Sequence, residues 1–132
     1  MPMALSFQIR DGLIEISFRG EIMAKDIVQA VVLVREAEAG LTVAPDRISD
    51  LSDANLSRLE AEDVREFAHQ RNAVFMKNKV KSAIIAHKPE QFGLARMFQS
   101  HNENPMVEVQ VFRDATSAYA WLGRAPKNVA AK

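Results

Sequence analysis

Residues Val80–Gly123 read VKSAIIAHKPEQFGLARMFQSHNENPMVEVQVFRDATSAYAWLG, and this stretch decides the fold class of the chain. Its pattern is an apolar strand, a short linker, a helix, a second apolar strand and a second helix. Alternating strands and helices are typical of crossover units that pack on a largely parallel sheet. The first strand, Ser82–His87, contains the uniformly apolar run Ala83–Ala86, which predicts a central strand buried on both faces.

The remainder of this stretch predicts three further elements. A helix is expected over Glu90–His101, and Val107–Phe112 predicts the second strand. Asp114 is a residue type that often caps the start of a helix, so the last helix is expected over Ala115–Leu122.

The N-terminal segment predicts an antiparallel hairpin. Apolar and polar residues alternate over Leu5–Arg10 and again over Leu13–Arg19, as expected for strands with one buried face. Asp11-Gly12 between them is among the strongest short hairpin signals, and Gly20 is expected to end the second strand.

The segment Ala24–Ala39 is ambiguous between strand and helix. Its centre, Val31–Val34, is rich in β-branched residues that favour strands. The flanking residues are good helix formers, Gly40 supplies a stop, and the total length suits a helix, so we predict a helix. Arg47–Leu51 then predicts only a short, weak strand.

A further helix is expected between that strand and Val80. Ser57 and Glu60 have the spacing of a capping box, and the helix is expected to run to about Lys77. Several of its residues recur at helical intervals, and the apolar ones are expected to face the sheet. These residues are Val64, Phe67, Ala68, Arg71, Val74 and Phe75.

We therefore predict a single α/β layer domain over residues 1–123, with an N-terminal β-hairpin. Its mixed sheet should have about five strands, with about four helices packed on it. Residues 124–132 are expected to form a flexible tail.

Composition excludes several classes of protein. The chain has 132 residues and balances 17 basic against 17 acidic side chains, so nothing favours nucleic acid as a partner. Cysteine is absent, which excludes disulfide frameworks and thiolate metal sites. No secretory signal begins the chain, and its apolar runs are too short for stable membrane insertion. We expect a soluble, cytoplasmic protein.

Several segments resemble the SpoIIAA-like family, which is also catalogued as a STAS/SEC14-type domain. They are DLSDANLS at 50–57, FGLARMFQ at 92–99, VEVQVFRD at 107–114 and AWLG at 120–123. The resemblance covers most of the chain and implies a mixed sheet with helices packed on it. It implies a non-enzymatic binding or regulatory module that acts through protein–protein contact. Binding of a lipid or small amphiphile in a SEC14-like manner is the alternative.

The resemblance also implies a regulatory serine. Anti-sigma-factor antagonists are switched by phosphorylation of a serine in an Asp-Ser-x-Gly-like turn between a strand and a helix. The nearest match here is Asp50–Asp53, in which Ser52 does not directly follow the aspartate and no glycine comes two residues later. Ser52 is the possible phosphoregulatory residue.

No constellation of residues predicts catalysis. Asp50, Asp53, His87 and Asp114 fall near the C-terminal ends of predicted strands, where open α/β sheets bind ligands. A metal-dependent phosphotransfer or hydrolase site there is the less favoured alternative, because turn and capping roles explain the aspartates. We expect no catalytic residue, no metal ligand and no cofactor.

The helix expected over Glu90–His101 carries the predicted binding surface. Its apolar residues spread over roughly 220° of the helix circumference, which is wider than one sheet contact requires. The predicted binding residues are Phe92, Arg96, Met97 and Phe98. The expected partners are a second copy of the chain as a homodimer, another protein, or a lipid or amphiphile whose head group meets Arg96.

Overall fold

The computed structural model describes residues 4–125, and its elements follow one another in the predicted order. The strands are β1 (Leu5–Arg10), β2 (Leu13–Glu21), β3 (Asp46–Asn55), β4 (Val80–Ile85) and β5 (Val107–Phe112). The helices are α1 (Ala24–Gly40), α2 (Ala61–Asn72), α3 (Pro89–His101) and α4 (Ala115–Trp121).

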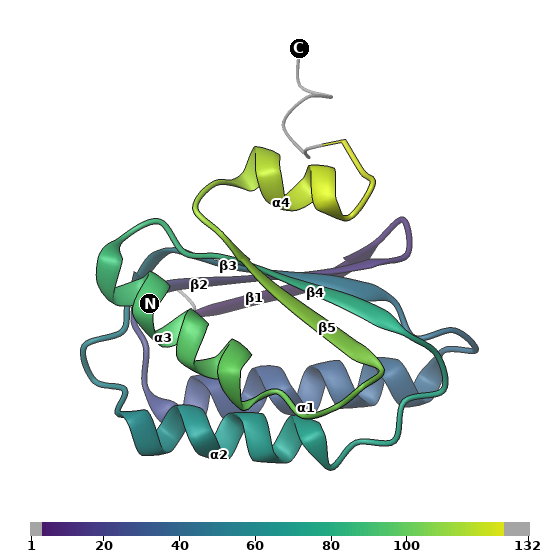
Figure 1. The fold of residues 1–132 in the computed structure, drawn as a ribbon, viewed down its shortest axis with the longest axis horizontal. Coiled ribbons are helices and arrows are strands. Elements are labelled where there is room, and N and C mark those ends of the chain that lie inside the picture. The colour runs from purple at the N-terminus through teal and green to yellow at the C-terminus, as the bar shows by residue number, and fades with distance from the viewer. Residues whose placement is uncertain (1–3, 126–132) are drawn as a thin grey trace.

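The strands form one sheet in the order β1-β2-β3-β4-β5. Only β1 and β2 pair antiparallel, whereas β2, β3, β4 and β5 pair parallel to their neighbours. Helices α1, α2 and α3 cover one face of the sheet, and α4 lies on the other (Figure 1). These observations confirm the prediction of an α/β domain with an N-terminal hairpin, a mixed sheet of five strands and four helices.

The hairpin turn has the backbone that its residues favour. Asp11 and Gly12 both have positive φ, at 52° and 73°, as a two-residue type I′ turn requires. The turn sets the register in which Arg10 faces Leu13 and Leu5 faces Phe18.

The ambiguous segment is helical throughout, as predicted. Val31 and Val34 are buried on the face of α1 that packs against the sheet. The weak helix propensity of valine is outweighed here because both side chains contribute to the core, and tertiary packing routinely overrides propensity.

The predicted bounds of α2 were wrong at both ends. Its N-cap is Glu60, whose backbone N–H donates to the Asp63 side chain at 2.9 Å. At its C-terminus, the Asn72 side chain donates to the His101 carbonyl at 3.0 Å and accepts from the Glu103 N–H at 2.9 Å. These bonds tie the end of α2 to the end of α3, so the chain leaves the helix there and Phe75 is 91% exposed.

Strand β3 extends four residues beyond the predicted limit of Leu51. Its pairing with β2 shifts register between Ser17 and Arg19 and then continues to Glu21. The predicted end of β2 at Gly20 was also wrong, because this glycine, with φ at 76°, lies inside the strand and pairs with Ala54.

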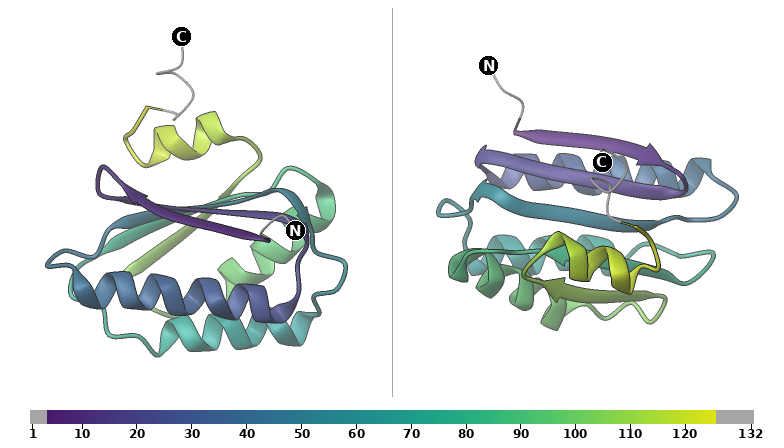
Figure 2. Two further views of the ribbon diagram at one scale, coloured as in Figure 1. Left: turned by 180° about the vertical axis from the view of Figure 1, so that it is seen from behind. Right: turned by 90° about the horizontal axis from the view of Figure 1, so that it is seen from above.

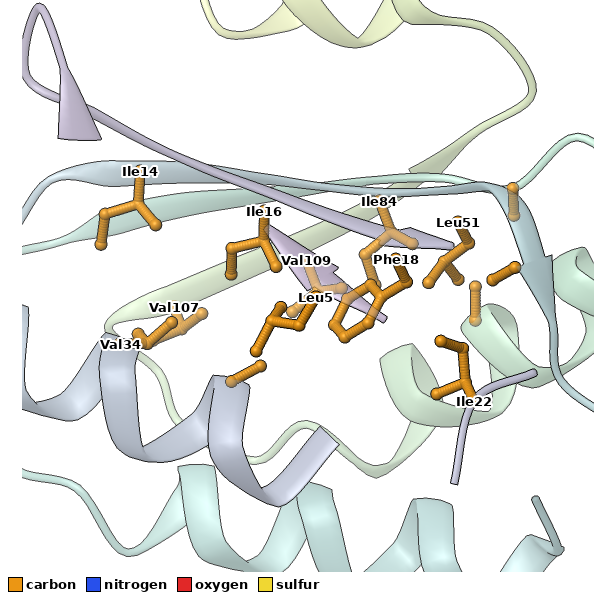
Figure 3. Packing of buried hydrophobic residues seen from close by; sticks show 14 of the residues in the cluster. Leu5, Ile14, Ile16, Phe18, Ile22, Val34, Leu51, Ile84, Val107 and Val109 are labelled. Carbon is orange, nitrogen blue, oxygen red and sulfur yellow. The ribbon is translucent and has the colours of Figure 1, made fainter. Parts of the chain in front are cut away.

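The sheet has a separate apolar core on each face. Figure 3 shows the core on the helix-layer side, where Ile14, Ile16, Phe18 and Ile84 lie between the sheet and the helices. Seen from above in Figure 2, α4 lies over the sheet. A smaller apolar cluster on this other face of the sheet includes residues of α4. Its buried members are Leu13, Ile48, Ala83, Ile85, Ala118, Tyr119 and Leu122.

A polar clasp holds α4 to the hairpin. Glu15 accepts hydrogen bonds from Gln8 at 2.7 Å, Arg10 at 2.9 Å and the Tyr119 hydroxyl at 3.1 Å. Burial acts to raise the pKa of Glu15, but the bonds from Arg10, Gln8 and Tyr119 outweigh it and leave that pKa below its usual value. Burial, with the Glu15 charge, raises the pKa of Tyr119 to about 12.

The structure describes only the first two residues of the predicted tail. Arg124 donates to the carbonyls of Asp11 and Gly12, at 2.7 and 3.3 Å, and so meets the hairpin turn. Residues 126–132 lie outside the described residues, so the predicted flexibility of the tail stays a prediction.

Candidate functional site

An apolar cavity of about 130 Å³ lies between the sheet and the helix layer. The backbones of α1 and α3 approach strands of the sheet, whereas the backbone of α2 lies closest to these two helices. All but four of the lining residues are apolar, and the four are Arg47, Ser49, Arg71 and Ser82. The apolar lining residues are Ile16, Phe18, Ile27, Ala30, Val31, Val34, Leu51, Leu56, Leu59, Val64, Phe67, Ile84, Leu94, Ala95 and Phe98.

The sheet wall of the cavity contains polar residues on its central strands, β3 and β4. In the register, Arg47 of β3 lies between Ile14 of β2 and Ser82 of β4. Two residues along, Ser49 lies between Ile16 and Ile84. Side chains two apart on a strand share a face, so these polar residues face the helix layer together with the apolar side chains in Figure 3.

Glu38 of α1 joins the two arginines in one buried ion cluster. Arg71 Nη2 donates to both Glu38 oxygens, at 3.0 and 2.7 Å, and Arg47 Nη1 donates to Oε2 at 3.2 Å. The exposed fractions are 5% for Glu38, 5% for Arg47 and 7% for Arg71. Two guanidinium groups share one carboxylate, so the cluster carries one excess positive charge.

Burial has a different consequence for each of the two arginines. Burial, and then the charge of Arg71, lower the pKa of Arg47 to about 10 despite the opposing effect of Glu38. Nε and Nη1 of Arg71 are buried and have no hydrogen-bond partner among residues 4–125. Buried donors are almost always paired in folded proteins, so this pair of nitrogens calls for an explanation.

The cavity is polar at one end and apolar at the other. Strands β2, β3 and β4 are parallel, so α1 and α2 run back antiparallel to them. Along α1, the residues that line the cavity begin at Ile27, and Glu38 near the end of the helix belongs to the ion cluster. Along α2, the lining residues run from Val64 to Arg71. Strand β3 runs in the other direction, so Arg47, its second residue, lies at the same end of the cavity as Glu38 and Arg71. The three charged residues therefore meet beneath the start of the central strands.

The predicted binding residues of α3 lie in different surroundings. Phe98 lines the cavity, together with Leu94. Phe92 packs against the core and is covered by the guanidinium of Arg113 at 4.1 Å from its ring centre, with Arg96 at 5.8 Å. Met97 is half-buried. The wide apolar arc is thus divided between core, cavity and a stacked arginine, and the binding role of the α3 residues stays a prediction.

Ser52 does not lie at a strand–helix turn, so that part of the prediction was wrong. It is half-buried within β3, its N–H donates to Asp50 at 2.9 Å, and its carbonyl accepts from Gln91 at 3.2 Å. The backbone of β3 continues past it because β2 supplies pairing partners as far as Asn55. Phosphorylation of Ser52 stays a prediction.

The acidic residues near the strand ends have structural roles or stand apart. Asp114 caps α4 as predicted, accepting a hydrogen bond from the Ser117 N–H at 2.7 Å, and this bond lowers the pKa of Asp114. Asp50 accepts from Ser52 within its own strand. Within residues 4–125, no group of three or more histidine, cysteine or acidic side chains is placed to hold a metal ion.

Glu38, Arg47 and Arg71 were missed as site residues by the sequence-based interpretation. The signal was present for Arg71, because it falls at helical spacing on the apolar side of α2 with Val64, Phe67 and Ala68. A charged residue on a buried helix face requires a partner or a ligand.

Comparisons with known proteins bear on the fold. No protein-family model matches the chain, and no curated protein matches it. None of the helices within residues 4–125 is long and apolar enough to cross a membrane. Among solved structures, the chain is similar to an uncharacterised protein of the DUF3478 family with a SpoIIAA-like fold from Shewanella loihica PV-4. The two share 21% identity and superpose with a TM-score of 0.58, over 90% of this chain and 92% of the other. The chain therefore adopts a SpoIIAA-like fold, as the sequence resemblance implied.

Proposed function

We propose that this protein is a non-enzymatic binding module that holds a small, largely apolar molecule in the cavity beneath its sheet. The observation that carries the proposal is the cavity itself, of about 130 Å³ and lined mainly by aliphatic and aromatic side chains. Well-packed interiors contain few voids larger than a water molecule, so an opening of this size in a small domain is unusual.

The size of the cavity limits its occupant. An engineered apolar cavity of about 150 Å³ stays dry and takes up one benzene molecule. The present cavity therefore suits an apolar body of about six carbon atoms by the same comparison. Its walls come from the sheet and from helices α1, α2 and α3, so an occupant would contact both the sheet and the helix layer.

Titration of the full chain with toluene tests the proposal, because toluene has only one carbon more than the six-carbon body considered above and carries no charge. We expect saturable shifts of the methyl NMR signals of cavity residues, such as Val31 and Ile84. Val31→Phe fills the cavity and should abolish these shifts. Val28→Phe is the matched control, since Val28 lies on the same helix, is exposed and does not line the cavity.

Failure of toluene to shift those methyl signals at its solubility limit would contradict the proposal. Equal binding by Val31→Phe, with circular dichroism showing an intact fold, would also contradict it. Overpacking a core typically costs about 1–3 kcal/mol, which a domain of this size tolerates.

Contact with a second copy of the chain is a second candidate, supported by a different feature. Val43 is 65% exposed and Phe75 91% exposed, on the loops after α1 and α2. These loops are joined, because the Ala44 N–H donates to the Asn78 side chain at 2.8 Å and that side chain donates back to the Ala44 carbonyl at 3.0 Å. Two large apolar side chains on a pair of hydrogen-bonded loops would bury readily against the same surface of a second copy of the chain.

Light scattering tests the second candidate. We expect a dimer mass for the full chain, and a monomer mass when Val43 and Phe75 are both replaced by serine. Met23→Ser, an exposed apolar position before α1, is the control. Met97→Asp examines the α3 surface predicted from the sequence in the same assay. A monomer mass for the unaltered chain would contradict dimerisation through Val43 and Phe75 and also dimerisation through the α3 surface.

A further inference from the structure

We propose that the occupant of the cavity is a small monocarboxylate, whose carboxylate pairs with Arg71 in the buried ion cluster while its apolar body fills the cavity. The inference rests on the proposed function and names its ligand class. The argument for the carboxylate is independent of the cavity volume, because it comes from the charges at one end of the cavity and from donors there that are unpaired within residues 4–125.

Charge balance favours an anion with a single negative charge. Arg47, Arg71 and Glu38 together carry one excess positive charge in a place that water barely reaches. Burying an uncompensated charge is expensive, and one carboxylate from a ligand would make the cluster neutral. A neutral ligand would leave the imbalance, and a dianion would reverse it.

Hydrogen bonding favours the same class of ligand. Arg71 satisfies Nη2 through Glu38, but its Nε and Nη1 are buried without partners among residues 4–125. A carboxylate oxygen accepts strong, charge-assisted hydrogen bonds from such groups. The hydroxyls of Ser49 and Ser82, which also line the cavity, could donate to the same anion.

The placement of polar and apolar groups fixes the orientation of the ligand. The charged end lies beneath the start of β3, and the apolar wall continues through Leu51, Leu56 and Val64 toward the other end. A molecule with one carboxylate and an apolar body of about six carbons matches both the charge and the volume. Benzoate represents an aromatic body of this kind, and hexanoate an aliphatic one.

The experiment titrates the full chain separately with benzoate, hexanoate and toluene, by calorimetry and by NMR. At least one carboxylate should bind to the unaltered chain. Arg71→Met should weaken that carboxylate about tenfold or more, since it removes charge-assisted bonds, while changing toluene binding less than about twofold. Arg58→Met, at an exposed arginine, is the control and should change nothing.

A measurement on the unaltered chain protects the test against loss of folding in Arg71→Met. The Nε–H resonance of Arg71 should move on addition of the carboxylate and stay in place with toluene. Toluene binding without carboxylate binding would overturn this inference and leave the proposed function standing. Binding of neither would overturn both. Carboxylate binding that Arg71→Met leaves unchanged, or that leaves the Arg71 resonance unmoved, would overturn the inference alone.

Discussion

Replacing Glu38 by glutamine should strongly destabilise the protein, because Glu38 is the only carboxylate that contacts the two buried arginines within residues 4–125. The substitution keeps the shape of the side chain and removes its charge. Arg47 and Arg71 would then remain buried with two positive charges and an amide between them. Both lie less than a tenth exposed, so solvent cannot screen them.

The expected loss of unfolding free energy in Glu38→Gln follows from the burial of both ion pairs. Removing one partner of a buried ion pair typically costs about 3–5 kcal/mol. Here one carboxylate serves two guanidinium groups, at 2.7 and 3.2 Å, so we expect the upper part of that range. The whole free energy of unfolding of a small domain is only about 5–15 kcal/mol, so Glu38→Gln should lose a large share of it.

Urea denaturation followed by circular dichroism measures this loss. Glu21→Gln is the matched control, because Glu21 pairs with Arg58 at the surface, where the side chains are 51% and 61% exposed. Exposed pairs contribute about 0–1 kcal/mol, so the control should stay near the unaltered chain. In the double variant Glu38→Gln, Arg71→Met, only one buried charge remains, and part of the stability should return. A loss of less than about 1 kcal/mol in Glu38→Gln would refute the reasoning, since it would mean that the arginines do not depend on Glu38.

Three further predictions concern the other face of the sheet and the hairpin. Tyr119→Phe should cost about 1–2 kcal/mol in urea titrations, since it removes the bond to Glu15. The raised pKa of Tyr119 adds stability that is complete below pH 10.0 and is lost as pH rises toward about 12. Melting curves should show this alkaline loss in the unaltered chain and a shallower one in Tyr119→Phe. The lowered pKa of Glu15 has the opposite sign: its contribution is complete above pH 4.5 and disappears as pH falls through the lower folded-state pKa, so Glu15→Gln should flatten the acid limb of the stability profile. Gly12→Ala should cost about 1–2 kcal/mol, because φ at 73° is unfavourable for alanine, and equal stability of that variant would contradict the turn assignment.

Local sequence signals were sufficient for most elements of the fold. The hairpin turn depends on Asp11 and Gly12, and the cap of α4 depends on Asp114, so neither needs knowledge of distant residues. The end of α2 was missed because it depends on bonds from Asn72 to residues near the end of α3. No sequence pattern within α2 itself indicates these hydrogen-bond partners.

The candidate site was harder to predict because its parts are distant in the sequence. Arg47, Glu38 and Arg71 belong to three different elements, and only the register of β3 and the antiparallel path of α1 and α2 bring them together. The presence of a charged residue on the apolar side of α2 was visible in advance. The cavity was not, since an unfilled volume depends on how several side chains pack together.

The clasp between Glu15 and Tyr119 has a consequence for how the chain is made. Its two ends are separated by 104 positions in the sequence. At about 5–20 residues per second, Glu15 is synthesised roughly 5–20 s before Tyr119. In the later part of that interval, β2 and β3 are already synthesised, but Leu13 and Ile48 have no α4 to cover them. The nascent protein therefore passes through a stage with one sheet face bare, and chaperone binding or aggregation would act at this stage rather than on the finished molecule.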